Sequence, residues 1–238
     1  MRNEADNLPV VDVDERFHNL IPSRFPPVPV YERIAGGRDE LFARVEEITN
    51  PRVRERDRLT QGLAPVDQQQ PRFKNWNHAP FVYPNPEGSR FFKANRNVLE
   101  LAGDLQTALV ISVAKRETFL RRTAEPPTLI EMRQIVRPVR GAYLDARGWD
   151  GVGDRDRRLA LGEEAVRQKL DGILFNPRER PSAVGMVVLK PECLGKPDQA
   201  DHFKYVWNGQ RITVLYSFRN DQKYSPDDLA LNETILAA

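Results

Sequence analysis

Two arginines are the residues whose type and setting best suit binding chemistry in this 238-residue sequence. Arg33 and Arg90 lie near the ends of predicted strands and are flanked by aromatic residues. A guanidinium group holds phosphate oxygens through paired hydrogen bonds, so one interpretation is a diphosphate-binding site. The alternative is that both are exposed strand-end arginines that hold no ligand.

Other catalytic signals are weak. The histidines His18, His78 and His202 are isolated and have no clustered cysteines, which favours surface or capping roles and argues against a metal site. The single cysteine, Cys193, excludes an internal disulfide, and no neighbour in the sequence activates it, so we expect an inert, partly buried thiol. Glycine motifs that bind phosphate and a serine-nucleophile elbow are absent.

The stretch Phe81–Leu120 must position Arg90. A turn-rich segment at 84–88 precedes the arginine, and a short apolar run, Val98–Leu101, follows it. Asp104 is placed as the N-cap of a helix that occupies the rest of the stretch.

The remaining pattern predicts short strands, few helices and long loops, hence an α+β fold with a mostly β core and flanking helices. An extended segment over 17–34 ends in a strand that carries Arg33. The other expected elements are a helix over 38–48, a connection over 51–80, a strand over 129–136, a loop over 141–155, a helix over 158–170, strands over 173–175 and 183–189, a β-hairpin over 203–216 that turns at Asn208-Gly209, and a short helix within 229–236.

Composition narrows the class of protein. Apolar residues make up 40% and charged residues 29%, as in globular domains. Because 36 basic residues face 34 acidic ones, we expect no nucleic-acid partner, and we interpret the basic run 52–58 as a solvated face. No apolar run has membrane-spanning length and the N-terminus is not a signal peptide, so we expect a cytoplasmic protein. We divide the chain into a flexible arm (1–15), one domain (16–218) and a loose tail (219–238).

Several sequence blocks follow one another in the order of a known family. They are IPSRFPPVPVYERI (21–34), ITNPR (48–52), YPNPEGSRF (83–91), LQTAL (105–109), KRETFLRRTAEPP (115–127), EMR (131–133), LALG (159–162), DGILF (171–175) and FKYVWNGQRI (203–212). Together they resemble the RES-domain proteins, toxins of toxin–antitoxin pairs that have an ADP-ribosyltransferase-like fold and consume NAD. The resemblance covers about residues 17–216.

The resemblance implies a site of two arginines, a tyrosine, a glutamate and a serine. Arg33 and Arg90 match the two arginines, which implies a grip on the diphosphate or nicotinamide ribose of NAD. The family tyrosine falls in the run NVLELA, where Leu99 and Glu100 stand instead. The family glutamate falls on Ile111.

Two further family positions also differ. The serine falls in the run 156–158, where Asp156 begins an Asp-Arg-Arg sequence, and a usual histidine is replaced by Lys115. Cleavage of the nicotinamide bond passes through an oxocarbenium-like state that a carboxylate stabilises, which an isoleucine cannot do. Glu100 is the one nearby residue that would restore a catalytic carboxylate, and its other interpretation is an edge-strand charge that faces water.

Three hypotheses follow. The first is a catalytically degenerate RES-fold protein that binds a protein, or binds NAD or a related nucleotide without turnover. The second is an active NAD-consuming enzyme, a glycohydrolase, phosphorylase or ADP-ribosyltransferase with a rearranged site. The third is a structural or assembly subunit that docks through residues 51–80. The resemblance implies an Xre-like helix-turn-helix antitoxin and self-association. From the isolated histidines and the lack of a membrane-length apolar run we expect no metal and no membrane.

Overall fold

The computed structural model describes residues 8–23, 77, 80–81, 85, 88–231 and 234–236. Within these residues one mixed sheet dominates, in the strand order β1-β2-β5-β4-β3-β6-β7-β8. The elements are β1 (Val10–Pro22), β2 (Leu99–Ala102), α5 (Leu105–Arg122), β3 (Thr128–Ala146), η2 (Asp150–Gly153), α6 (Arg155–Arg167), β4 (Gly172–Phe175), β5 (Gly185–Val188), η3 (Pro191–Cys193), β6 (Asp198–Trp207), β7 (Ile212–Ser217), β8 (Lys223–Tyr224) and α7 (Pro226–Leu229). The fold is α+β and mostly β, as predicted.

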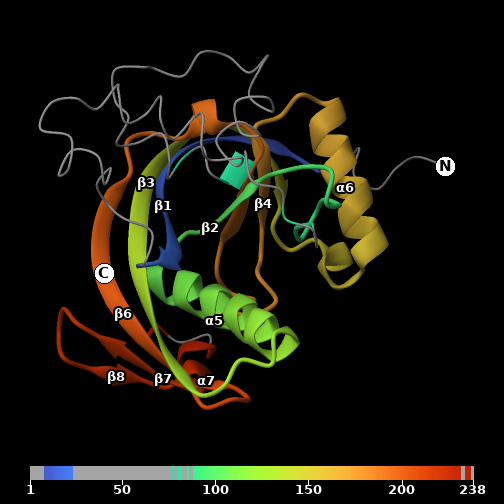
Figure 1. Ribbon diagram of the computed structural model, residues 1–238. Helices are drawn as coiled ribbons and strands as arrows, with labels where there is room; N and C mark the ends of the chain where they lie inside the picture. Colours follow the sequence, from blue (N-terminus) through green and yellow to red (C-terminus); the bar gives the residue numbers. More distant parts are fainter. Residues whose placement is uncertain are drawn as a thin grey trace, which may run out of the picture.

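Part of the sheet closes on itself. β1 pairs antiparallel with β3 along its whole length, β3 pairs parallel with β4, and β5 pairs antiparallel with both β4 and β2. The pairing of His18 with Ala102 joins β2 back to β1 and completes the ring. Apolar side chains of all five strands pack together, namely Val13, Phe17, Leu99, Leu101, Val139, Tyr143, Leu174, Met186 and Val188. Figure 1 shows β1 and β3 side by side along one side of the molecule.

The long strands β1 and β3 correct two expectations. Residues 10–15 do not form a flexible arm, because they lie in β1, where Val13 and Phe17 are buried while Asp12 and Asp14 are exposed. Residues 141–146 do not form a loop, because they continue β3 and pair with both β1 and β4. Long-range pairing, which local composition does not report, extends both strands.

The predicted β-hairpin is confirmed. β6 and β7 pair antiparallel, and the Asn208 side chain accepts hydrogen bonds from the backbone N–H groups of Gln210 and Arg211 in the turn. The hairpin buries its aromatic residues against α5 and α7. We call this cluster the hairpin core: Leu109, Val110, Val113, Leu120, Met132, Phe203, Tyr205, Trp207, Ile212, Leu215 and Leu229.

Helix α5 begins as predicted. The Asp104 side chain caps it by accepting a hydrogen bond of 2.8 Å from the Thr107 N–H. In Figure 1 α5 runs below the ring, and α6 lies on the side opposite β3. None of the helices within the described residues combines the length and the apolar content that a membrane span requires.

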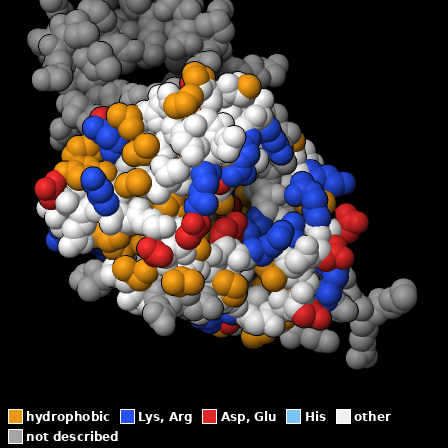
Figure 2. Space-filling model, turned by 90° about the horizontal axis from the view of Figure 1, so that it is seen from below, with side chains coloured by type: hydrophobic (Ala, Val, Ile, Leu, Met, Phe, Trp, Pro, Cys, Tyr) orange, Lys and Arg blue, Asp and Glu red, His pale blue; other side chains and the backbone are white. Residues whose placement is uncertain are grey.

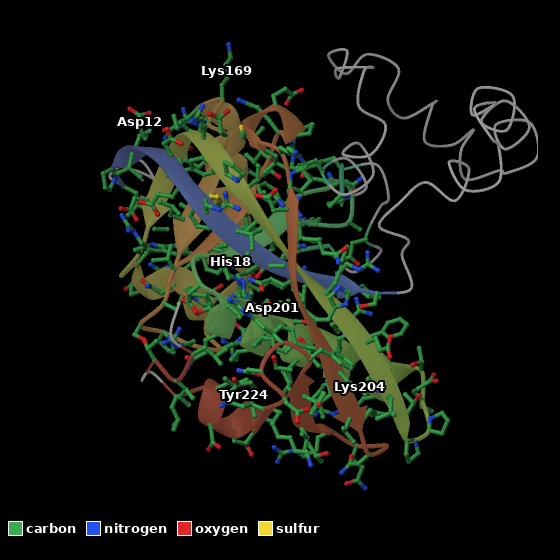
Figure 3. All side chains as sticks on the ribbon, turned by 90° about the vertical axis from the view of Figure 1, so that its left-hand side faces the viewer. Asp12, His18, Lys169, Asp201, Lys204 and Tyr224 are labelled. Atoms are coloured by element: carbon green, nitrogen blue, oxygen red, sulfur yellow. The ribbon has the colours of Figure 1, made fainter. Side chains whose placement is uncertain are left out.

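The C-terminal region is more ordered than the expected loose tail. β8 pairs with β7, and α7 replaces the short helix that was expected within 229–236. Leu229, at the end of α7, is fully buried in the hairpin core, which explains why the segment is fixed. Figure 3 shows Tyr224 and Lys169 at opposite ends of the molecule, with His18 of β1 between them.

The expected strand over 30–34, the helix over 38–48 and the basic run 52–58 lie outside the described residues. So does the 51–80 connection except for residues 77 and 80.

Candidate functional site

A tight turn before β2 positions Arg90. Gly88 has a φ of 73°, a conformation that glycine adopts without strain, and the Ser89 N–H donates to the Phe92 carbonyl at 2.8 Å. Helix α6 then packs closely on this turn, because a Cβ at Gly162 would overlap the Phe91 carbonyl oxygen. The sequence GSRF and a glycine in α6 therefore fix the backbone that carries Arg90.

Arg90 meets Glu100 of β2 in a nearly buried ion pair. Nε and Nη2 of Arg90 both lie 3.0 Å from Glu100 Oε1, and Lys115 Nζ of α5 lies 2.9 Å from Glu100 Oε2. The Arg90 and Glu100 side chains are only 11% and 8% exposed. Burial alone would raise the pKa of Glu100, but the charges of Lys115 and Arg90 outweigh it and lower the pKa to about 2. Glu100 is therefore held ionised at neutral pH.

A second carboxylate reaches Arg90 from the connection between β4 and β5. Glu179 Oε1 and Oε2 lie 3.0 and 3.1 Å from Arg90 Nη2, and the Glu179 side chain is 23% exposed. The guanidinium also stacks on Phe175, with 5.0 Å between the guanidinium carbon and the ring centroid. Arg90 is thus fixed by two carboxylates and an aromatic ring.

A pocket of about 380 Å³ opens beside this cluster, and we call it the arginine pocket. Its lining residues are Arg90, Arg158, Arg178 and Glu179. Arg158 comes from α6 and is fixed by donating to the carbonyl oxygens of Arg90 (3.0 Å) and Val152 (2.6 Å). Figure 2 shows the molecule from below, where Lys and Arg side chains surround a hollow with acidic side chains beside them.

The arginine pocket has an excess of positive charge. Burial, followed by the charges of Arg90, Arg178 and Arg155, lowers the pKa of Arg158 from its ordinary value. These cations therefore repel one another, and Glu179 is the one acidic residue among the four that line the pocket. An anion placed between the arginines relieves this repulsion, so the pocket is suited to phosphate groups.

The structure brings together two of the predicted site residues, Arg90 and Glu100, whereas Arg33 lies outside the described residues. Interpreting Glu100 as an edge-strand charge that faces water is wrong, because β2 lies between β1 and β5 and the side chain is nearly buried. Ile111, at the position of the family glutamate, packs against Ala102 in the core.

The other substituted positions also differ in their surroundings. Leu99 is buried inside the ring, and Asp156 is exposed in the first turn of α6. Lys115, at the position of the family histidine, is the lysine that pairs with Glu100.

Sequence reasoning missed Arg158, Arg178 and Glu179. The segment NPRERP at 176–181 places three consecutive charges between two apolar strands, and this charged run was the available signal. Arg158 had no comparable signal, because α6 is a polar helix that carries three other arginines, at 155, 157 and 167.

The remaining candidates lie elsewhere. His18 is partly buried and does not lie at the surface as expected. Its Nδ1 lies 2.7 Å from Gln134 Nε2, and burial is the main cause that lowers its pKa. Burial also raises the pKa of the partly buried Cys193 thiol to about 12, in agreement with an inert thiol. Across the described ranges, no group of three or more His, Cys, Asp or Glu residues is arranged to hold a metal ion.

Comparisons with known proteins agree with the resemblance. A family model for the RES domain matches residues 68–208. The "Uncharacterized protein y4oC" of Sinorhizobium fredii (strain NBRC 101917 / NGR234) is 45% identical over 209 residues, which cover 87% of this chain and 90% of the relative. Among solved structures, the crystal structure of the M. tuberculosis MbcT-MbcA toxin-antitoxin complex matches with a TM-score of 0.43 and 12% identity, over 86% of this chain and 90% of that chain.

Proposed function

Because the chain belongs to the RES-domain family, we propose that it binds NAD or a related nucleotide through the arginine pocket and does not cleave it. The observation that carries this proposal is the set of contacts around Glu100. This buried carboxylate is neutralised by Arg90 on one side and Lys115 on the other. A carboxylate that already has two cationic partners gives little stabilisation to a developing oxocarbenium ion.

Binding is supported by the lining of the arginine pocket. Arg90, Arg158 and Arg178 come from three different segments and converge on one space. The two negatively charged phosphates of a diphosphate can each accept hydrogen bonds from these guanidinium groups. Each such charge-assisted contact contributes about 1.5–3 kcal/mol. The family glutamate position adds nothing to catalysis here, since Ile111 is a core residue.

The test combines binding with turnover. The purified protein is titrated with NAD by calorimetry, and parallel samples with and without phosphate are assayed for released nicotinamide. We expect binding without release. Arg178→Gln, at an exposed side chain that lines the pocket, should weaken binding about tenfold. Arg219→Gln is the matched control, because its side chain is 76% exposed and lies away from the pocket. Steady nicotinamide release by the wild-type protein would contradict the proposal.

A second candidate is an active NAD-consuming enzyme, and Glu179 is the observation that favours it. Its carboxylate lines the arginine pocket and is more exposed than that of Glu100. In that case Glu179 stabilises the cationic ribose, and Glu179→Gln abolishes nicotinamide release. Unchanged release in Glu179→Gln would exclude Glu179 from this role.

For the partner, we propose an antitoxin protein in the cytoplasm, on the basis of the family resemblance. Co-expression with a candidate helix-turn-helix antitoxin, followed by size-exclusion chromatography with light scattering, tests the partner and self-association together. Elution of both proteins as separate species would contradict the proposal.

A further inference from the structure

The two carboxylates on Arg90 occupy different sides of the guanidinium group. Glu100 contacts Nε and Nη2 from within the sheet, while Glu179 places both its oxygens on Nη2. Of the two, Glu179 lines the arginine pocket and has the more exposed side chain. Glu100 therefore holds Arg90 in the fold, and Glu179 covers the part of Arg90 that faces the pocket.

A carboxylate and a phosphate make the same kind of contact with arginine. Each presents two oxygens to the N–H groups of the planar guanidinium. An incoming phosphate that binds Arg90 must therefore take the place of the Glu179 carboxylate. If Glu179 stays in place, its charge repels the same anion.

The backbone around Glu179 is anchored while its side chain reaches toward solvent. Arg180 is buried and donates to Asp104 Oδ1 and Thr107 Oγ1, both at 3.0 Å. Asn176 Nδ2 donates to the Ala183 carbonyl at 2.7 Å and ties together the two ends of the connection. Rotation of the Glu179 side chain thus uncovers Arg90 without a change in the fold.

We propose that Glu179 is an internal competitor that occupies the phosphate position on Arg90, so that the pocket admits diphosphate ligands and rejects monoanions. This inference rests on the proposed nucleotide-binding function. A monoanionic carboxylate that replaces Glu179 exchanges one carboxylate contact for another and gains nothing. A diphosphate reaches Arg90 and also Arg158 or Arg178, which Glu179 alone does not satisfy.

The test uses inorganic pyrophosphate and acetate as probes, titrated by calorimetry into the full chain in a buffer free of phosphate. In Glu179→Gln, pyrophosphate binding should tighten about tenfold, because one competing charged contact is lost, and acetate binding should appear. Glu192→Gln, at an exposed glutamate in η3, is the control and should leave both affinities unchanged. If Glu179→Gln unfolds on thermal melting, Glu179→Asp replaces it, since a shorter side chain withdraws the carboxylate from Arg90 and should tighten binding less.

The outcomes separate the two ideas. Wild-type binding of pyrophosphate with no tightening in the Glu179 variants overturns the competitor and leaves the proposed function standing. Wild-type binding of pyrophosphate that tightens about tenfold in Glu179→Gln, together with acetate binding only in that variant, supports the competitor. Failure of both proteins to bind pyrophosphate overturns the proposed function together with the inference.

Discussion

The hairpin core and the arginine pocket bury side chains of opposite kinds. The hairpin core is almost entirely apolar, and its three aromatic residues on β6 are no more than 1% exposed. Beside the arginine pocket, the ion pair of Arg90 and Glu100 instead keeps two charged groups at low exposure, 11% and 8%. Burial of apolar area stabilises the fold, whereas burial of charges costs desolvation energy that ion pairing only offsets. Burial in the hairpin core therefore contributes more to stability, and the charged groups beside the arginine pocket are the ones that the proposed binding would use.

The largest effect should come from emptying the hairpin core. Trp207 is 1% exposed and its indole N–H donates to the Glu125 carbonyl at 2.9 Å. Trp207→Ala should lower the free energy of unfolding by about 3–5 kcal/mol, through lost burial and the cavity left behind. Urea denaturation measures the change, with Phe119→Ala, 54% exposed, as the control. If Trp207→Ala lowers the free energy of unfolding no more than Phe119→Ala does, the hairpin core is not the main source of stability.

Removing the buried charge at Glu100 should have the next largest effect. Glu100→Gln leaves Arg90 and Lys115 with a neutral partner, although Arg90 keeps Glu179. Breaking a buried ion pair costs about 3–5 kcal/mol, and we expect the lower end, about 3 kcal/mol, because one carboxylate remains. Denaturation of Glu100→Gln beside the exposed control Glu163→Gln checks this. Equal stabilities of the two variants would show that the Glu100 cluster does not contribute to folding.

The stabilising effect of the ionised Glu100 carboxylate should depend on pH. The pKa of Glu100 is lowered in the folded protein from 4.5 to about 2, so its contribution is complete above about pH 4.5 and is lost as the pH falls toward 2. That shift corresponds to roughly 3 kcal/mol. The stability difference between wild type and Glu100→Gln should therefore shrink steadily between pH 5 and about 2. A difference that stays constant over this range would contradict the lowered pKa.

The smallest effect should come from Lys115. Its side chain is 55% exposed, so solvent screens its pairing with Glu100. Lys115→Gln should lower the free energy of unfolding by no more than about 1 kcal/mol, and added salt should reduce the difference. A loss comparable to that of Glu100→Gln would mean that Lys115, rather than Arg90, is the main partner of the carboxylate.

The two regions also differ in how far the sequence predicts them. The alternation of Phe203, Tyr205 and Trp207 before an Asn-Gly turn is a local pattern, and the structure confirms the hairpin. The N-cap at Asp104 is equally local and is also confirmed. Such features follow from the chain within about ten residues, where periodicity and turn chemistry decide the structure.

The arginine pocket depends on contacts between distant residues. Arg90 and Glu179 are 89 positions apart, and Arg158 joins them through a hydrogen bond to the Arg90 carbonyl. Residue type and setting indicated Arg90, and the family resemblance indicated Arg90 and Glu100, but neither indicated that Glu179 would share the same guanidinium. The second half of β3 could not be predicted from the local sequence for the same reason, because its pairing with β1 and β4 makes it a strand.

Whether the arginine pocket binds a nucleotide and leaves it intact can be tested in one sample. The most direct measurement is proton NMR of NAD mixed with the purified protein and followed over time, because one sample reports both binding and cleavage. We expect the NAD signals to broaden with wild-type protein, to broaden less with Arg178→Gln, and never to give way to free nicotinamide. A nicotinamide signal that grows with wild-type protein and disappears in Glu179→Gln would contradict this expectation and identify an active enzyme.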